Sequence, residues 1–151
     1  MSIRLAAYAV CLQGERVLLV RAVSGSWTLP GGGVEHGEDP YDTVLREFTE
    51  ETGHFGAVER LLGVDSRVIP ATEAVRGELH QNVGIYYAVR IVSGQLRPEV
   101  DGSTDRAEWT PIAAVADLTR SSLVDVGITL ARSRPADGHV AQVHVGGRVV
   151  H

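Results

Sequence analysis

The chain has 151 residues, of which 44% are hydrophobic, and a formal net charge of −5. This length predicts a single globular domain over residues 1–151, and the acidic balance excludes broad electrostatic binding of nucleic acid polymers. Because no segment approaches the roughly 18 apolar residues that span a bilayer and the lone Cys11 excludes an internal disulfide, we expect a cytoplasmic protein that does not contact membranes.

The N-terminal third begins with a strand pattern. Apolar and β-branched residues fill positions 3–12 and 16–22, and Gln13-Gly14-Glu15 between them is typical of a turn. This arrangement predicts an antiparallel hairpin. A glycine-rich loop is expected next, over residues 29–37.

A helix over residues 40–52 is the best-marked element. Asp39 is suited to the N-cap and Pro40 to the first helical position, while Gly53 provides the stop. Four apolar residues recur at spacings of i, i+3, i+4 and i+7: Tyr41, Val44, Leu45 and Phe48. They form one stripe, so the helix is expected to pack on a sheet.

The rest of the chain alternates strands and helices. The predicted strands are 58–69, 81–92 and 107–110, the predicted helices are 111–118 and 122–132, and the tail 139–150 is predicted as a hairpin turning at Gly146-Gly147. A polar loop at 70–80 separates the first two strands. The pattern indicates an α/β or α+β fold, a mixed sheet with helices on both faces.

Three carboxylates share one side of the helix at 40–52. Glu47, Glu50 and Glu51 stand at i, i+3 and i+4, beside the apolar stripe. Such a cluster is either a solvated charged face or a site for a hard divalent cation such as Mg²⁺, which prefers oxygen ligands. The glycines at 31–33, just before the helix, let a backbone approach a ligand closely and favour the second interpretation.

The whole segment follows a recognisable spacing. It reads Gly, five residues, Glu, seven residues, Arg-Glu, apolar, any, Glu-Glu, any, Gly, and its matching positions are Gly32, Glu38, Arg46, Glu47, Phe48, Glu50, Glu51 and Gly53. In this spacing the chain resembles the Nudix hydrolase (MutT-like) family. His54 departs from the pattern, which has an aliphatic residue there.

The resemblance implies an α/β/α sandwich and a set of roles. Glu47, Glu50 and Glu51 would bind Mg²⁺ or Mn²⁺ together with the Gly31 carbonyl, Arg46 would orient Glu47 or its neighbours, and Gly32, Glu38 and Gly53 would be structural. The implied reaction is metal-dependent hydrolysis of a diphosphate linkage in a nucleoside diphosphate derivative, whether an NTP, an ADP-ribose-like compound or a nucleotide sugar. The general base would be Glu50 or Glu51, or an acid of a later loop: Asp101, Asp105 or Glu108.

Other features leave alternatives open. Trp27 could stack on a base or belong to the core, and of the neighbouring strand residues Tyr86 and Tyr87 at most one faces a pocket. We take Tyr86 as the candidate for substrate contact. The alternative function is a nucleotide-sensing module without catalysis, and the tail hairpin would cover a sheet edge or contribute to a homodimer.

Overall fold

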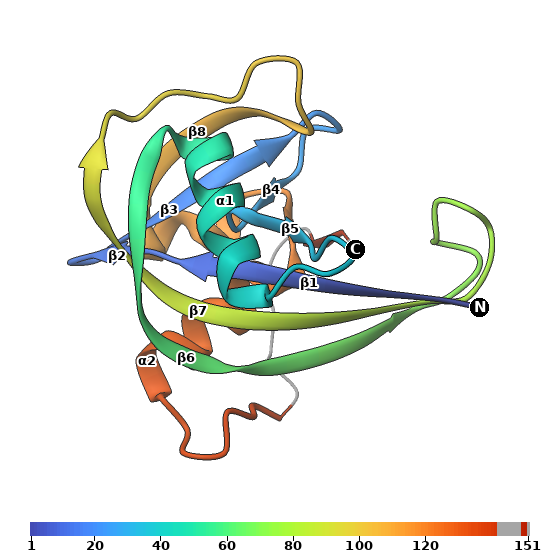
Figure 1. The fold of residues 1–151 in the computed structure, drawn as a ribbon. Helices are drawn as coiled ribbons and strands as arrows, with labels where there is room; N and C mark the ends of the chain where they lie inside the picture. The colour runs from blue at the N-terminus through green and yellow to red at the C-terminus, as the bar shows by residue number, and fades with distance from the viewer. Residues whose placement is uncertain (142–148, 151) are drawn as a thin grey trace.

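The computed structural model describes residues 1–141 and 149–150 (Figure 1). Its strands are β1 (Ser2–Val10), β2 (Leu12–Gln13), β3 (Arg16–Ala22), β4 (Trp27–Thr28), β5 (Gly31–Gly33), β6 (His54–Ile69), β7 (His80–Gly94), β8 (Thr104–Pro111), β9 (Arg120–Ser121) and β10 (Val149–Val150). Its helices are α1 (Pro40–Thr52), the 3-10 helix η1 (Ile112–Asp117) and α2 (Ser122–Ser133).

The strands form two mixed sheets. One has the order β5-β1-β7-β6, and the other has the order β10-β9-β4-β3-β2 with β8 paired to β3. Strand β1 runs parallel to β7 and antiparallel to β5. The predicted hairpin of 3–12 with 16–22 is therefore wrong for most of its length, because only β2 pairs with β3 while β1 enters the other sheet.

Helix α1 has the predicted bounds and the predicted caps. The Tyr41 amide donates to the Asp39 carboxylate at 2.8 Å, Pro40 occupies the first turn, and Gly53 ends the helix in the left-handed region at φ 79°. Val44 and Phe48 from the apolar stripe are fully buried, whereas Tyr41 is exposed. The caps determine where the helix begins and ends, and the apolar stripe determines which side packs against the sheet.

Strand β1 divides the core into two layers. Ala6, Tyr8 and Val10 pack with residues of α2, and their neighbours at 7 and 9 pack with Val44 and Phe48 of α1. Because successive side chains of a strand point to opposite faces, one strand serves both layers. The two helices therefore cover opposite faces, as predicted for an α/β/α sandwich, and Figure 1 shows α1 and α2 on separate sides of the sheets.

Several elements differ from the predicted ones. The glycine-rich loop contains the short strand β5, which the neighbouring β1 draws into its sheet. Strand β6 begins at His54, directly after the helix cap, and the segment after Pro111 is a 3-10 helix. The turn of the predicted tail hairpin, with residues 142–148, lies outside the described residues, and the described β10 pairs with β9 in parallel.

No helix in the described part of the chain combines the length and the apolar character needed to cross a membrane.

Candidate active site

The acidic side of α1 lies against the glycine strand β5. The Gly31 amide donates to Glu51 Oε1 at 2.7 Å, so the start of β5 is bonded directly to the last turn of α1. A Cβ at Gly32 would lie 2.6 Å from Glu47 Oε1. Because Gly32 has no side chain, the backbone of β5 can lie directly against the Glu47 carboxylate while the Gly31 amide bonds Glu51.

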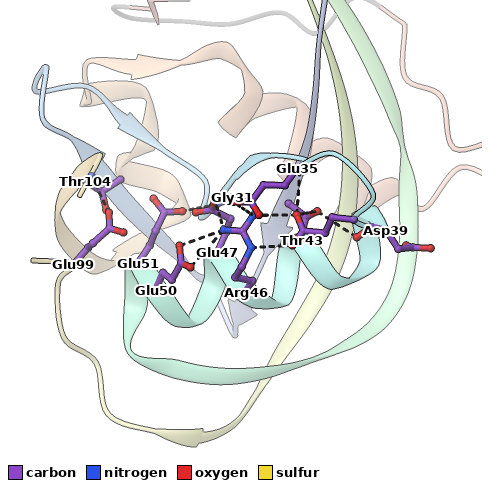
Figure 2. Close-up of polar contacts among 11 residues, drawn as sticks. Gly31, Glu35, Asp39, Thr43, Arg46, Glu47, Glu50, Glu51, Glu99 and Thr104 are labelled. Carbon is purple, nitrogen blue, oxygen red and sulfur yellow. Dashed lines mark hydrogen bonds and ion pairs between the residues drawn. The ribbon is translucent and has the colours of Figure 1, made fainter. Parts of the chain in front are cut away.

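Arg46 connects the acids of the preceding loop to those of the helix. Its guanidinium donates to both oxygens of Glu38, at 2.9 and 3.0 Å, and through Nη1 to Glu47 at 3.1 Å and to Glu50 at 3.4 Å (Figure 2). This bidentate pairing with Glu38 is the strongest arrangement of an arginine with a carboxylate. These acids raise the pKa of Arg46, chiefly through the bond with Glu38.

Glu38 closes the loop that precedes the helix. Besides Arg46, its carboxylate accepts from the Thr43 hydroxyl at 2.6 Å and from the Glu35 amide at 3.2 Å. The bonds with Arg46, and then with Thr43, lower the pKa of Glu38 to about 2. Glu38 is thus held ionised by its partners and ties the loop to α1.

The three helix carboxylates differ in burial. The Glu50 side chain is 46% exposed, that of Glu47 is 15% exposed, and Glu51 as a residue is 1% exposed. Burial raises the pKa of Glu51 to about 8 in spite of the Gly31 bond, and burial also raises the pKa of Glu47 against the effect of Arg46. The site therefore holds carboxylates whose ionised forms are costly without a further cation.

A fourth carboxylate, Glu99, joins the cluster from the loop between β7 and β8. Its charge contributes to raising the pKa of both Glu47 and Glu51, and Figure 2 shows it beside Glu51. The Thr104 amide and hydroxyl each donate to Glu99 Oε1 at 3.2 Å. Glu99 was not among the residues predicted from the sequence, because no motif surrounds it and only the fold brings it close to α1.

The acids named for the later loop have other partners. Asp105 forms a two-pronged bond with Arg21 at 2.9 and 3.1 Å, and Glu108 pairs with Arg106 at 2.6 Å. Asp101 is exposed, with its backbone in the left-handed region. Among the acids of residues 95–108, Glu99 is the one whose charge acts on the buried helix carboxylates.

The donor set suits a hard divalent cation. Its members are carboxylate oxygens and a glycine backbone, and among the described residues no basic side chain pairs with Glu51 or Glu99. As they stand, no three His, Cys, Asp or Glu side chains of the described residues converge closely enough to hold a metal ion. Glu47 and Glu50 are turned toward Arg46, and Glu51 toward the Gly31 amide.

The two aromatic candidates lie apart from this cluster. Trp27 is partly buried and packs against the core layer on the α2 side. Tyr86 belongs to the same layer and is 1% exposed, with its ring centroid 5.4 Å from that of Tyr8. Tyr87 faces α1 instead, where it meets Tyr41 edge to face. In this structure the Tyr86 ring contributes to the core and has no free face.

Comparisons with known proteins agree with the geometry. In sequence the chain is 32% identical over 108 residues to an RNA pyrophosphohydrolase of Azorhizobium caulinodans, an alignment that covers 62% of this chain. The chain spans less than two thirds of the length of the curated relatives it matches first, 63% for this one and 57% for Nudix hydrolase 25 of Arabidopsis thaliana.

Solved structures share the fold. A NUDIX hydrolase from Nitrosomonas europaea has a TM-score of 0.73 at 24% identity and covers 92% of this chain and 97% of its own. A MutT NUDIX hydrolase from Burkholderia pseudomallei has a TM-score of 0.62 at 26% identity and covers 86% of this chain and 96% of its own. The family model described as NUDIX domain matches residues 2–148. The chain therefore belongs to the Nudix family.

Proposed function

We propose that the protein hydrolyses a diphosphate linkage in a nucleoside diphosphate derivative with the help of Mg²⁺, which Mn²⁺ could replace. The observation that carries this proposal is the buried Glu51, which lies beside Glu47 and Glu99 with no basic side chain paired to it among the described residues. A carboxylate cluster of this kind gains most from a divalent cation. Family membership and the pyrophosphohydrolase relative support the same reaction.

The proposed roles combine the resemblance to the family with the contacts of this structure. Glu47, Glu50 and Glu51 hold the metal with the Gly31 carbonyl, and Glu99 adds a further oxygen donor. When bound, the cation supplies positive charge to the diphosphate oxygens and makes the attacking water more acidic. Arg46 positions Glu47 and Glu50, because its guanidinium donates to both of them and to Glu38. Glu50 or Glu51 accepts the proton of the water.

Substrate identity is tested with a panel. Wild-type protein with Mg²⁺ is offered NTPs, 8-oxo-dGTP, ADP-ribose, NADH, diadenosine polyphosphates, nucleotide sugars and RNA with a 5′-triphosphate, and the products are identified. Release of pyrophosphate and NMP indicates an NTP substrate, whereas AMP and ribose phosphate indicate ADP-ribose.

The catalytic site is tested with Glu51→Gln on the best substrate. We expect turnover to fall by at least about 100-fold, the scale for loss of one group that supports charge in a transition state. Glu59→Gln makes the same change at an exposed glutamate of β6 and is expected to keep wild-type turnover. Equal activity of Glu51→Gln and wild type would contradict the site. Tight nucleotide binding by calorimetry without products would favour the sensing module instead.

A further inference from the structure

The loop at residues 95–103, which carries Glu99, is fixed to the body at both ends. At its start the Arg97 amide donates to the Thr52 carbonyl at the end of α1, at 2.9 Å. At its end the Val23 amide, just after β3, donates to the Ser103 carbonyl at 3.0 Å. The loop is thus tied to α1 and to the second sheet, which brings Glu99 to the acidic side of the helix.

Within the loop, the Glu99 side chain folds back onto the backbone that follows it. A Cβ at Gly102 would lie 2.0 Å from Glu99 Cδ, so only a glycine leaves room for the carboxylate there. The Thr104 amide and hydroxyl then donate to the same oxygen, Glu99 Oε1. Thr104 itself is 5% exposed at the start of β8, so both donors come from a fixed position.

Thr104 is also near enough to the Glu51 carboxylate to lower its pKa slightly against the larger effect of burial. Figure 2 shows Glu99, which accepts from Thr104, next to Glu51 of α1. The single proton of the hydroxyl is donated to Glu99.

We propose that Thr104 is a positioning residue that holds the Glu99 carboxylate beside Glu47 and Glu51, so that loop and helix act as one oxygen-donor set. This role rests on the proposed metal-dependent hydrolysis. It assigns to the β7–β8 loop a share of the cation site that depends on one buried hydroxyl and on the space left by Gly102.

The test uses variants that change either the Thr104 hydroxyl or the space that Gly102 leaves for Glu99. Thr104→Val keeps the shape and removes the hydroxyl, Thr104→Ser keeps the hydroxyl, and Gly102→Ala displaces Glu99 without removing a polar group. Glu99→Gln measures the contribution of the carboxylate itself. Binding of Mn²⁺ to the protein without nucleotide is followed by titration calorimetry, and kcat and KM are measured on the best substrate with urea denaturation as the check on folding.

For Thr104→Val we expect Mn²⁺ to bind about 10-fold more weakly and kcat to fall about 10- to 100-fold, the scale for loss of a hydrogen bond to a charged group. KM should change little, Thr104→Ser should restore both values, and Gly102→Ala should resemble Thr104→Val. The proposal is overturned if Thr104→Val binds Mn²⁺ like wild type while Glu99→Gln binds it weakly, or if Glu99→Gln itself leaves Mn²⁺ binding unchanged.

These outcomes separate the two proposals. If wild type hydrolyses nothing on the panel but the Mn²⁺ series behaves as expected, the positioning role stands and the proposed reaction fails. If hydrolysis depends on Glu51 but Mn²⁺ binding and kcat are indifferent to Thr104, the reaction stands and the positioning role fails.

Discussion

The carboxylates at the two ends of helix α1 have pKa values shifted in opposite directions. Near the start, Glu38 accepts from Arg46, Thr43 and the Glu35 amide, and these partners lower its pKa to about 2. Near the end, burial raises the pKa of Glu51 to about 8. One motif therefore contains an acid whose ionised form is stabilised by its protein partners and an acid whose ionised form is disfavoured by burial. The contacts at the first end hold the loop on the helix, and the acids at the second end are the ones that the proposed function assigns to the cation.

The largest expected effect is on the stability of metal-free protein. The pKa of Glu51 rises from 4.5 in the unfolded chain to about 8 in the fold, so between these values unfolding releases a proton and folding becomes less favourable as pH rises. We expect the free energy of unfolding in EDTA to fall by about 3 to 5 kcal/mol from pH 4.5 to 8. Urea denaturation across this range measures it.

Glu51→Gln is the control for this prediction. It should flatten the decline, and saturating Mg²⁺ should restore stability to wild type above pH 7 by binding the ionised carboxylate. A wild-type curve that stays level in EDTA between pH 5 and 8 would contradict the assignment of an uncompensated buried acid.

The next effect removes the connection between the two ends. Arg46→Ala deprives Glu38, Glu47 and Glu50 of their shared partner and is expected to lower the free energy of unfolding by about 1 to 2 kcal/mol, mainly because the partly buried Glu47 loses its charged partner. Arg46→Lys keeps the charge but cannot bond both oxygens of Glu38 while reaching Glu47, and should lie between. Chemical denaturation at pH 7 checks the order; equal stability of the Lys variant and wild type would speak against the two-pronged bond.

The smallest effect is confined to the start of the helix. Thr43→Val removes the hydroxyl that donates to Glu38 and keeps the buried shape, so we expect a loss of about 1 kcal/mol. The Glu38 pKa should rise toward its ordinary value, and NMR titration of that carboxyl measures the shift. Mn²⁺ affinity should stay at the wild-type value, in contrast to Thr104→Val. Weakened Mn²⁺ binding in Thr43→Val would show that the two ends are not separate.

The sequence predicted best what local chemistry determines. The bounds of α1 follow from Asp39, Pro40 and Gly53, and strand β3 has the predicted limits because its apolar run is bounded by turns. The fold class followed from the alternation of elements. Glu47, Glu50 and Glu51 were predicted to share a helix side, and their spacing alone is enough for that.

Long-range pairing explains what the sequence did not predict. The neighbouring strand along the chain was the predicted partner of β1, but β1 pairs with β7, more than seventy residues later. In the middle of that sheet both apolar faces of β1 are buried. Glu99 is placed by the Thr52 carbonyl and by Thr104, and neither contact has a signature in the residues around Glu99. Tyr86 was predicted to contact substrate, but its side chain is buried in the core, and the alternation of the strand alone did not reveal which face is covered.

The single guanidinium of Arg46 has a consequence for the order of events. It is shared among Glu38, Glu47 and Glu50, and Glu51 and Glu99 add further acid at the same place. A nucleotide substrate with a charged diphosphate would be repelled by these acids until a cation has bound. Under the proposed function the cation would therefore be needed for substrate binding as well as for hydrolysis, and nucleotide binding measured in EDTA would be weak.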